Sequence, residues 1–104
     1  MTAGTRAERW DFTLYIDGAS MSSLHAIEEV RRVCDQHLGG QADVEIIDLH
    51  QQPELGRRDR VVVVPTLIRK VPGPPRRFVG ELSDSAWRSL GLDLGPAGAR
   101  DRSA

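Results

Sequence analysis

The sequence of 104 residues predicts a single α/β domain. The first observation behind this prediction is an order of signals. A strand-like segment at Trp10–Asp17 precedes a helical pattern, and a second strand-like segment follows at Val44–Leu49. The second observation is Val64-Pro65-Thr66-Leu67, which places a proline directly before a third strand-like segment. A core of this size can fold without disulfides or metals.

Apolar residues at intervals of three and four predict a helix after the first strand. Ser22 and Ser23 are expected to cap it, and we expect it to run to about Leu38. Gly39-Gly40 then supplies the left-handed stop that helix C-termini favour. The residues expected to form its apolar stripe are Leu24, Ile27, Val30, Cys34 and Leu38.

The local signals of the second half disagree with one another. Val61–Val64 has the highest β-propensity of the chain, although the predicted fold needs an approach to the third strand there. Pro53 is suited to the first turn of a short helix. Thr66–Lys70 and Arg76–Gly80 are expected to pair as an antiparallel hairpin, and Ser83–Leu90 to form the last helix. Such disagreement tends to mark function.

This order of elements, with a proline before the third strand, is typical of the thioredoxin-like fold. In that fold the proline takes a cis peptide bond, a form that is rare except before proline. The loop Asp17–Ser23 has no cysteine where a thiol enzyme carries Cys-x-x-Cys. Cys34 is the only cysteine, and its place on the apolar stripe predicts a buried small hydrophobe. We therefore expect no catalytic residues and a binding function.

The composition argues against several other functions. The net charge of −1 and 5% aromatic content do not fit a nucleic-acid binder. His25, His37 and His50 lack metal-ligand spacing, and no phosphate-binding glycine loop occurs, so neither a metal nor a cofactor is expected. No apolar run is long enough for a membrane span, and residues 1–9 lack a signal-peptide core. A cytoplasmic protein is expected.

The expected domain is residues 10–94, flanked by disordered ends at 1–9 and 95–104, which are small, polar and rich in glycine or charge. Basic side chains are the candidates for partner binding, because arginine is favoured at interfaces. Four are expected to face one another across the hairpin, and two more directly precede Asp59. These six candidates are Arg69, Lys70, Arg76, Arg77, Arg57 and Arg58.

Several short segments are each weak signals, but their combination along the chain is specific. They are Leu14-Tyr15-Ile16 with Gly18, Val44–Leu49 with Pro53-Glu54-Leu55, Pro65-Thr66-Leu67, the proline turn with Arg76-Arg77, Gly80-Glu81-Leu82-Ser83, and Gly91-Leu92-Asp93-Leu94. From about Phe12 to Leu94, this order resembles the KaiB family of circadian-clock proteins.

The resemblance implies a non-enzymatic adaptor that binds the hexameric RecA-like ATPase KaiC. Such an adaptor modulates the phosphorylation or ATPase cycle of KaiC in a circadian, timer or stress-response system. The resemblance also implies self-association as a dimer or tetramer. It further implies a metamorphic chain that switches between a ground-state KaiB fold and a thioredoxin-like fold, two packings within a few kcal/mol. The positions assigned to the switch are Pro65, Pro72, Pro74, Pro75, Gly91 and Asp93.

Two features depart from the cyanobacterial pattern. His25 and His50 stand where those members carry basic residues, which weakens the case for their partner KaiA.

Two rival functions stay open. One is a thioredoxin-like redox protein without Cys-x-x-Cys, which an insulin-reduction assay with and without Cys34 would detect. The other is a KaiB-like sensory input module of a histidine kinase system, with the kinase as a partner.

Overall fold

The computed structural model describes residues 9–92 and 94. Its four-stranded sheet has the order β2-β1-β3-β4, in which β1 pairs parallel with β2 and antiparallel with β3. The strands are β1 (Trp10–Ile16), β2 (Ala42–Asp48), β3 (Thr66–Val71) and β4 (Arg76–Val79). The helices are α2 (Met21–His37), α3 (Pro53–Arg58) and α4 (Asp84–Ser89). The single α/β domain is therefore confirmed.

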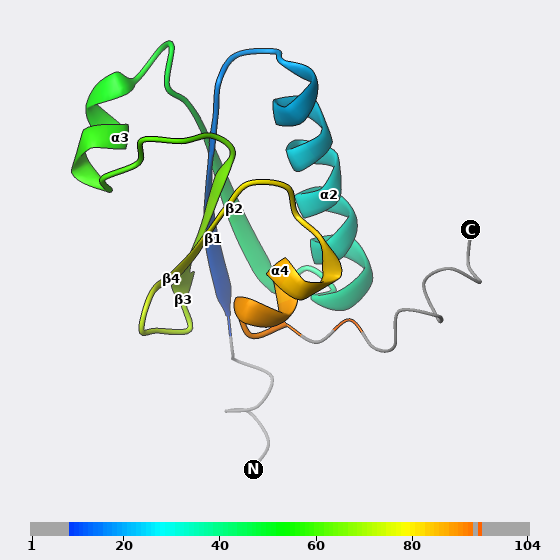
Figure 1. Cartoon of the computed structure of the whole chain (residues 1–104). Coiled ribbons are helices and arrows are strands. Elements are labelled where there is room, and N and C mark those ends of the chain that lie inside the picture. The colour runs from blue at the N-terminus through cyan, green and yellow to red at the C-terminus, as the bar shows by residue number, and fades with distance from the viewer. Residues whose placement is uncertain (1–8, 93, 95–104) are drawn as a thin grey trace.

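The helices form a layer on each side of the sheet (Figure 1). α2 and α4 cover one face, here called the α2 face, and α3 covers part of the other, here called the α3 face. Asp93 and the predicted tails, apart from Arg9, lie outside the described residues. Within the described part of the chain, no helix is both long and apolar enough to span a bilayer.

The larger hydrophobic core lies on the α2 face. Phe12, Leu14 and Ile16 alternate along β1 and point into this core, because successive strand side chains face opposite sides of a sheet. Trp87 of α4 is fully buried and meets the edge of the Phe12 ring at a centroid distance of 5.9 Å. Val30 of α2 packs in the same cluster.

The smaller core lies on the α3 face. Tyr15, Ile47 and Ile68 come from three neighbouring strands and pack with Val61, while Leu55 of α3 covers them. The central strand β1 is thus buried on both faces, which explains why its second half has no exposed residue. The α3 face also carries the polar network described below.

The start of α2 differs from the expectation. Ser20 caps the helix by accepting a hydrogen bond from the Ser23 amide at 3.2 Å, so Ser22 and Ser23 lie inside the helix. Ser23 is buried, and its hydroxyl accepts the Asp17 amide at 3.0 Å. The buried stripe runs through Ser23 and Ala26, whereas Leu24 is 43% exposed. A serine buried by its hydrogen bonds cannot be distinguished from a surface serine by hydrophobic periodicity.

In the segment before β3, the approach that the thioredoxin-like fold needs prevails over the high β-propensity of the valines. Val61 and Val62 have no regular structure, Val63 and Val64 form a bend, and the strand begins only at Thr66. The Val64–Pro65 peptide bond is cis, as are Val71–Pro72 and Gly73–Pro74. β3 and β4 pair as the predicted antiparallel hairpin. The C-terminal end of α2 is also as expected, because Gly39 and Gly40 after it have left-handed φ angles of 52° and 85°.

Arg69 of β3 is the main polar group of the α2 face. It is only 7% exposed, and its guanidinium donates to the carbonyl oxygens of Leu90 at 2.7 Å and Pro74 at 2.8 Å. Gly91 has φ of 93°, and a Cβ there would lie 2.5 Å from Arg69 Nη1. Glycine at this position therefore suits both the backbone conformation and the space that Arg69 fills. Arg69 links β3 to the end of α4 and to the proline turn.

We predict that Arg69→Met lowers the free energy of unfolding by about 2 kcal/mol, because two carbonyls lose a charged donor in a buried site. Urea unfolding of both proteins measures this. The matched control is Arg76→Met, directly opposite in the hairpin. Arg76 is exposed, so its replacement should change stability by no more than about 0.5 kcal/mol. Equal effects of the two substitutions would contradict a structural role for Arg69.

Candidate functional site

The predicted basic residues of the hairpin lie on two different faces. Arg69 pairs with Arg76 and Ile68 with Arg77 across the hairpin, so alternation places Arg69 and Arg76 on the α2 face. Arg76 accordingly donates to the carbonyl oxygen of Ser89, the last residue of α4, at 3.4 Å. Lys70 and Arg77 lie on the α3 face. The structure therefore does not bring these four side chains into one patch.

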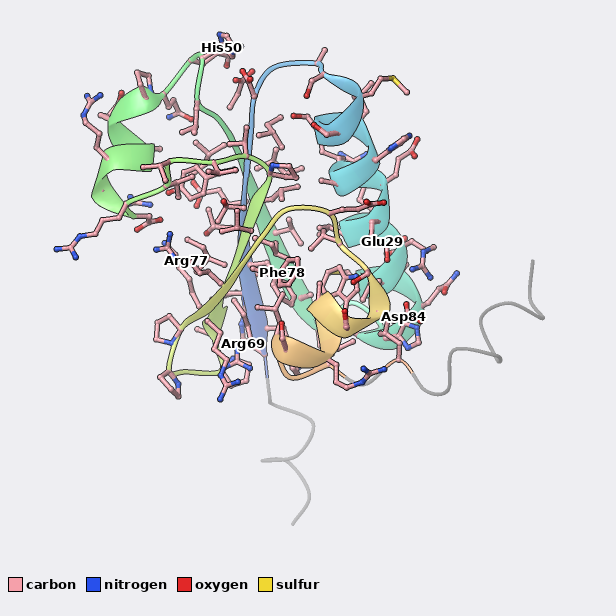
Figure 2. All side chains as sticks on the ribbon, in the orientation of Figure 1. Glu29, His50, Arg69, Arg77, Phe78 and Asp84 are labelled. Carbon is pink, nitrogen blue, oxygen red and sulfur yellow. The ribbon has the colours of Figure 1, made fainter. Side chains whose placement is uncertain are left out.

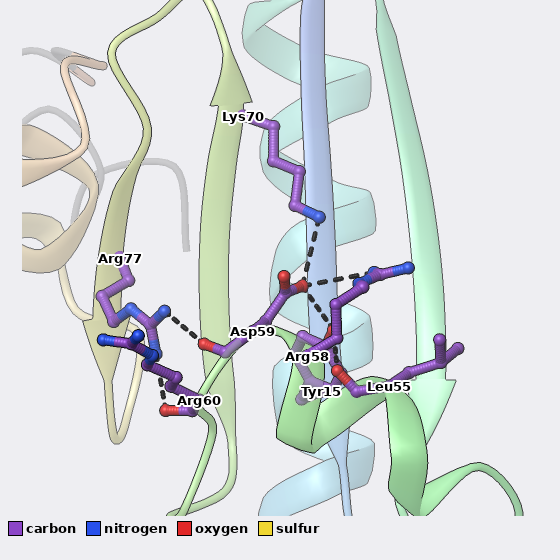
Figure 3. A network of polar contacts seen from close by, with 7 residues as sticks. All are labelled: Tyr15, Leu55, Arg58, Asp59, Arg60, Lys70 and Arg77. Atoms are coloured by element: carbon purple, nitrogen blue, oxygen red, sulfur yellow. Dashed lines mark hydrogen bonds and ion pairs between the residues drawn. The ribbon is translucent and has the colours of Figure 1, made fainter.

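Lys70 and Arg77 instead join the arginines around α3. The result is a basic cluster built from the end of α3, the following loop, β3 and β4 (Figure 3). We call it the arginine corner. Its members are Arg57, Arg58, Arg60, Lys70 and Arg77.

Asp59 is the carboxylate that contacts several side chains in and around the arginine corner. Its Oδ2 atom accepts hydrogen bonds from the Tyr15 hydroxyl at 2.5 Å and from Lys70 Nζ at 3.1 Å. Arg58 Nη2 lies 3.3 Å from the same oxygen. The Tyr15 hydroxyl also lies 3.0 Å from the carbonyl oxygen of Leu55 (Figure 3). One carboxylate therefore links β1, α3 and β3.

Arg77 holds the loop after α3 through its backbone. Its guanidinium donates to the carbonyl oxygens of Asp59 at 2.5 Å and Arg60 at 3.1 Å. Arg60 has φ of 57°, a left-handed conformation that is uncommon for a side-chain-bearing residue. The two bonds from β4 fix the backbone on either side of this conformation. The position of Arg60 is thus set by Arg77 as well as by α3.

The network shifts the pKa values of its members in opposite directions. Burial would raise the pKa of Asp59, but hydrogen bonds from Tyr15, Arg58 and Lys70 outweigh it and lower that pKa to about 2. Burial, followed by the hydrogen bond to Asp59, raises the pKa of Tyr15 to about 12. The hydrogen bond to Asp59 also raises the pKa of Arg58. At neutral pH, Asp59 is therefore charged and Tyr15 is protonated.

The corner has an excess of positive charge available to a partner. Arg57 and Arg60 are exposed, and neither side chain makes an ion pair or hydrogen bond to other described residues. Arg58 and Lys70 share the single carboxylate of Asp59. Such a surface attracts an acidic one. Sequence reasoning placed Asp59 among the arginines but missed Tyr15, since no local signal shows that a strand tyrosine reaches this loop.

The residues that the structure describes support neither metal binding nor thiol chemistry. Among the described residues, no group of three or more histidine, cysteine or acidic side chains could hold a metal ion. Cys34 lies in the last turns of α2, away from the helix N-terminus, and is buried. Burial, with a smaller effect of Asp35, raises the pKa of its thiol to about 11, so it is not a thiolate at neutral pH.

The single tyrosine of the chain makes the network measurable. We predict that tyrosinate absorbance rises with a midpoint near pH 12, while circular dichroism shows that the protein remains folded. Because the folded-state pKa is raised, the protonated phenol adds stability below pH 10 that disappears as pH rises through 12. Asp59→Asn should lower the midpoint but leave it above 10, since burial persists, and the control Asp35→Asn should not move it. A wild-type midpoint at 10 would show that Tyr15 is neither buried nor hydrogen-bonded to Asp59.

Comparison with known proteins gives a consistent result. The KaiB domain family matches residues 13–94. The circadian clock protein KaiB3 of Synechocystis sp. is 42% identical over 89 residues, which cover 86% of this chain and 87% of that protein. The circadian clock oscillator protein KaiB of Prochlorococcus marinus is 35% identical over 81 residues, covering 78% of this chain and 77% of the relative.

Two solved structures support the fold. The N-terminal domain of Synechococcus elongatus SasA superposes with a TM-score of 0.65 at 22% identity, covering 86% of this chain and 90% of that one. A chloroplastic thioredoxin z has a TM-score of 0.66 at 21% identity, covering 86% and 82%. These likenesses confirm the thioredoxin-like architecture. With the family match over most of its length, the chain belongs to the KaiB family of circadian clock proteins.

Proposed function

We propose that this protein is a non-enzymatic adaptor that binds a KaiC-type hexameric ATPase through the arginine corner and modulates its phosphorylation or ATPase cycle. The observation that carries the proposal is the corner itself, in a chain of the KaiB family. Arg58 and Lys70 contact the Asp59 carboxylate and Arg77 holds the backbone of the loop, which leaves the side chains of Arg57 and Arg60 for a partner.

The geometry suits an acidic protein surface in two ways. Arginine presents a planar, permanently charged group that pairs with carboxylates in two-point contacts. The backbone that carries Arg60 is held by Arg77, so binding orders fewer degrees of freedom than it would in a free loop. Charges of this kind act mainly on the association rate and on specificity. The ring subunit should therefore present carboxylates where the corner docks.

We predict that the double variant Arg57→Glu/Arg60→Glu binds a KaiC-type hexamer at least about tenfold more weakly, mainly through slower association. Surface plasmon resonance at several salt concentrations measures both rates. The wild-type association rate should fall as salt rises, and that of the variant should not. Arg31→Glu is the matched control, because Arg31 is an exposed arginine on α2. If the double variant and Arg31→Glu bind alike, the corner is a solvated surface without a role in docking.

Other expectations, from the sequence itself and from the family resemblance, remain predictions in the form first given. These are the cytoplasmic location, self-association as a dimer or tetramer, a histidine kinase as a further partner, and a second, ground-state fold. The described fold is the thioredoxin-like one, which the resemblance assigns to the ATPase-binding form. The redox alternative has no support in the site, since Cys34 is buried and its pKa is raised to about 11.

A further inference from the structure

A groove of about 560 Å³ lies on the α2 face, away from the arginine corner. One wall is α2 and the other is the segment after β4, with Pro65 between them. Its volume falls within the roughly 300–1,000 Å³ that ligand pockets occupy. Apolar surface comes from Ala26, Pro65 and Leu82. Nothing in the proposed docking of the arginine corner uses this groove.

Two glutamates give the groove an uncompensated negative charge. Glu28 on α2 and Glu81 after β4 stand on opposite walls, and both are exposed. Neither makes an ion pair or hydrogen bond with any other described residue. Glu29, by contrast, is held by Arg32 at 2.7 Å and by the Trp87 indole at 3.1 Å, so its charge is already matched. Figure 2 shows Glu29 on the α2 side and Arg77 on the other side of the sheet.

This combination fits an arginine or lysine side chain. Both residues carry an aliphatic stem that packs on apolar surface and a cationic head that carboxylates bind. Carboxylates on two walls can hold one such head between them. A bare metal ion would need a closed set of ligands, and the described residues contain no such group.

The segment that leads to Pro65, at the edge of the groove, favours a peptide as the ligand over a free amine. Val62 and Val63 are 93% and 52% exposed and precede Pro65 by three and two residues. Their amides, and that of Val64, donate no hydrogen bond within the described part of the chain. Exposed aliphatic side chains and free backbone donors together suit a neighbouring stretch of polypeptide.

We propose that this groove docks a short extended segment of a partner protein in which an arginine or lysine is flanked by aliphatic residues. The cationic head lies between Glu28 and Glu81, and its stem lies on Leu82 and Ala26. The flanking aliphatic residues cover the exposed valines. The adaptor then carries two surfaces of opposite charge on opposite faces of the sheet. This site is independent of the proposed function of the arginine corner.

The test is an NMR titration of the isotope-labelled full chain with the peptide acetyl-Ala-Leu-Arg-Leu-Ala-amide. We expect saturable shifts of the Ala26 and Leu82 amides at peptide concentrations up to about 5 mM, a range suited to weak peptide contacts. The same peptide with glutamate in place of arginine should cause none. Glu28→Gln/Glu81→Gln should weaken binding about tenfold, whereas the control Glu45→Gln on β2 should change it less than twofold.

Three results would each overturn the proposal. One is the absence of saturable shifts with the arginine peptide, and another is equal binding of the two peptides. The third is unchanged affinity of the double glutamine variant, whose amide spectrum shows whether it is folded. Arg57→Glu/Arg60→Glu should bind the arginine peptide as the wild type does. That variant therefore separates failure of the groove from failure of the arginine corner.

Discussion

The polar contacts of the α3 face converge on one carboxylate, that of Asp59. Asp59 receives the Tyr15 hydroxyl from β1, Lys70 from β3 and Arg58 from the end of α3. α3 is only six residues long, too short to be stable by itself, and it covers the sheet through a small cluster of apolar contacts. The polar links to Asp59 therefore supply much of what fixes α3 and its loop on the sheet. They also set where the arginines stand.

The same contacts hold the arginines in place before a partner binds. An isolated cluster of arginines on a loop would repel itself and move, and any partner would have to order it. Here Asp59 offsets part of the repulsion, and Arg77 holds the loop through two backbone carbonyls. The arrangement leaves Arg57 and Arg60 with the least compensated charge. The α2 face shows the opposite pattern, with uncompensated glutamates beside an apolar groove.

Most of the fold could be predicted from the sequence. Alternation and propensity located β1, β2 and the hairpin, and three-and-four spacing located α2, because these patterns reflect burial directly. The start of α2 was wrong by about two residues, because several neighbouring serines could each cap the helix. Leu24 was wrongly placed in the buried stripe, since Ser23 takes that position through hydrogen bonds that apolar periodicity does not register.

The site was less accessible to sequence reasoning. The basic residues were identified, but strand alternation separates Arg69 from Lys70, and burial of an arginine depends on carbonyls that lie far away in the chain. Tyr15 and Asp59 are 44 residues apart and meet only after the sheet and α3 have formed. Long-range polar contacts of this kind leave no local periodicity. Family resemblance supplied the expected partner, whereas only the structure shows which arginines share a face.

The central claim is that the Asp59 network holds the arginine corner in its binding arrangement. The most direct test is the affinity of Tyr15→Phe for a KaiC-type hexamer, because this change removes one buried hydroxyl and no surface charge. The account predicts that binding weakens by about threefold or more, with every arginine still present, since the loop must then be ordered on binding. Unchanged affinity of Tyr15→Phe would contradict the claim.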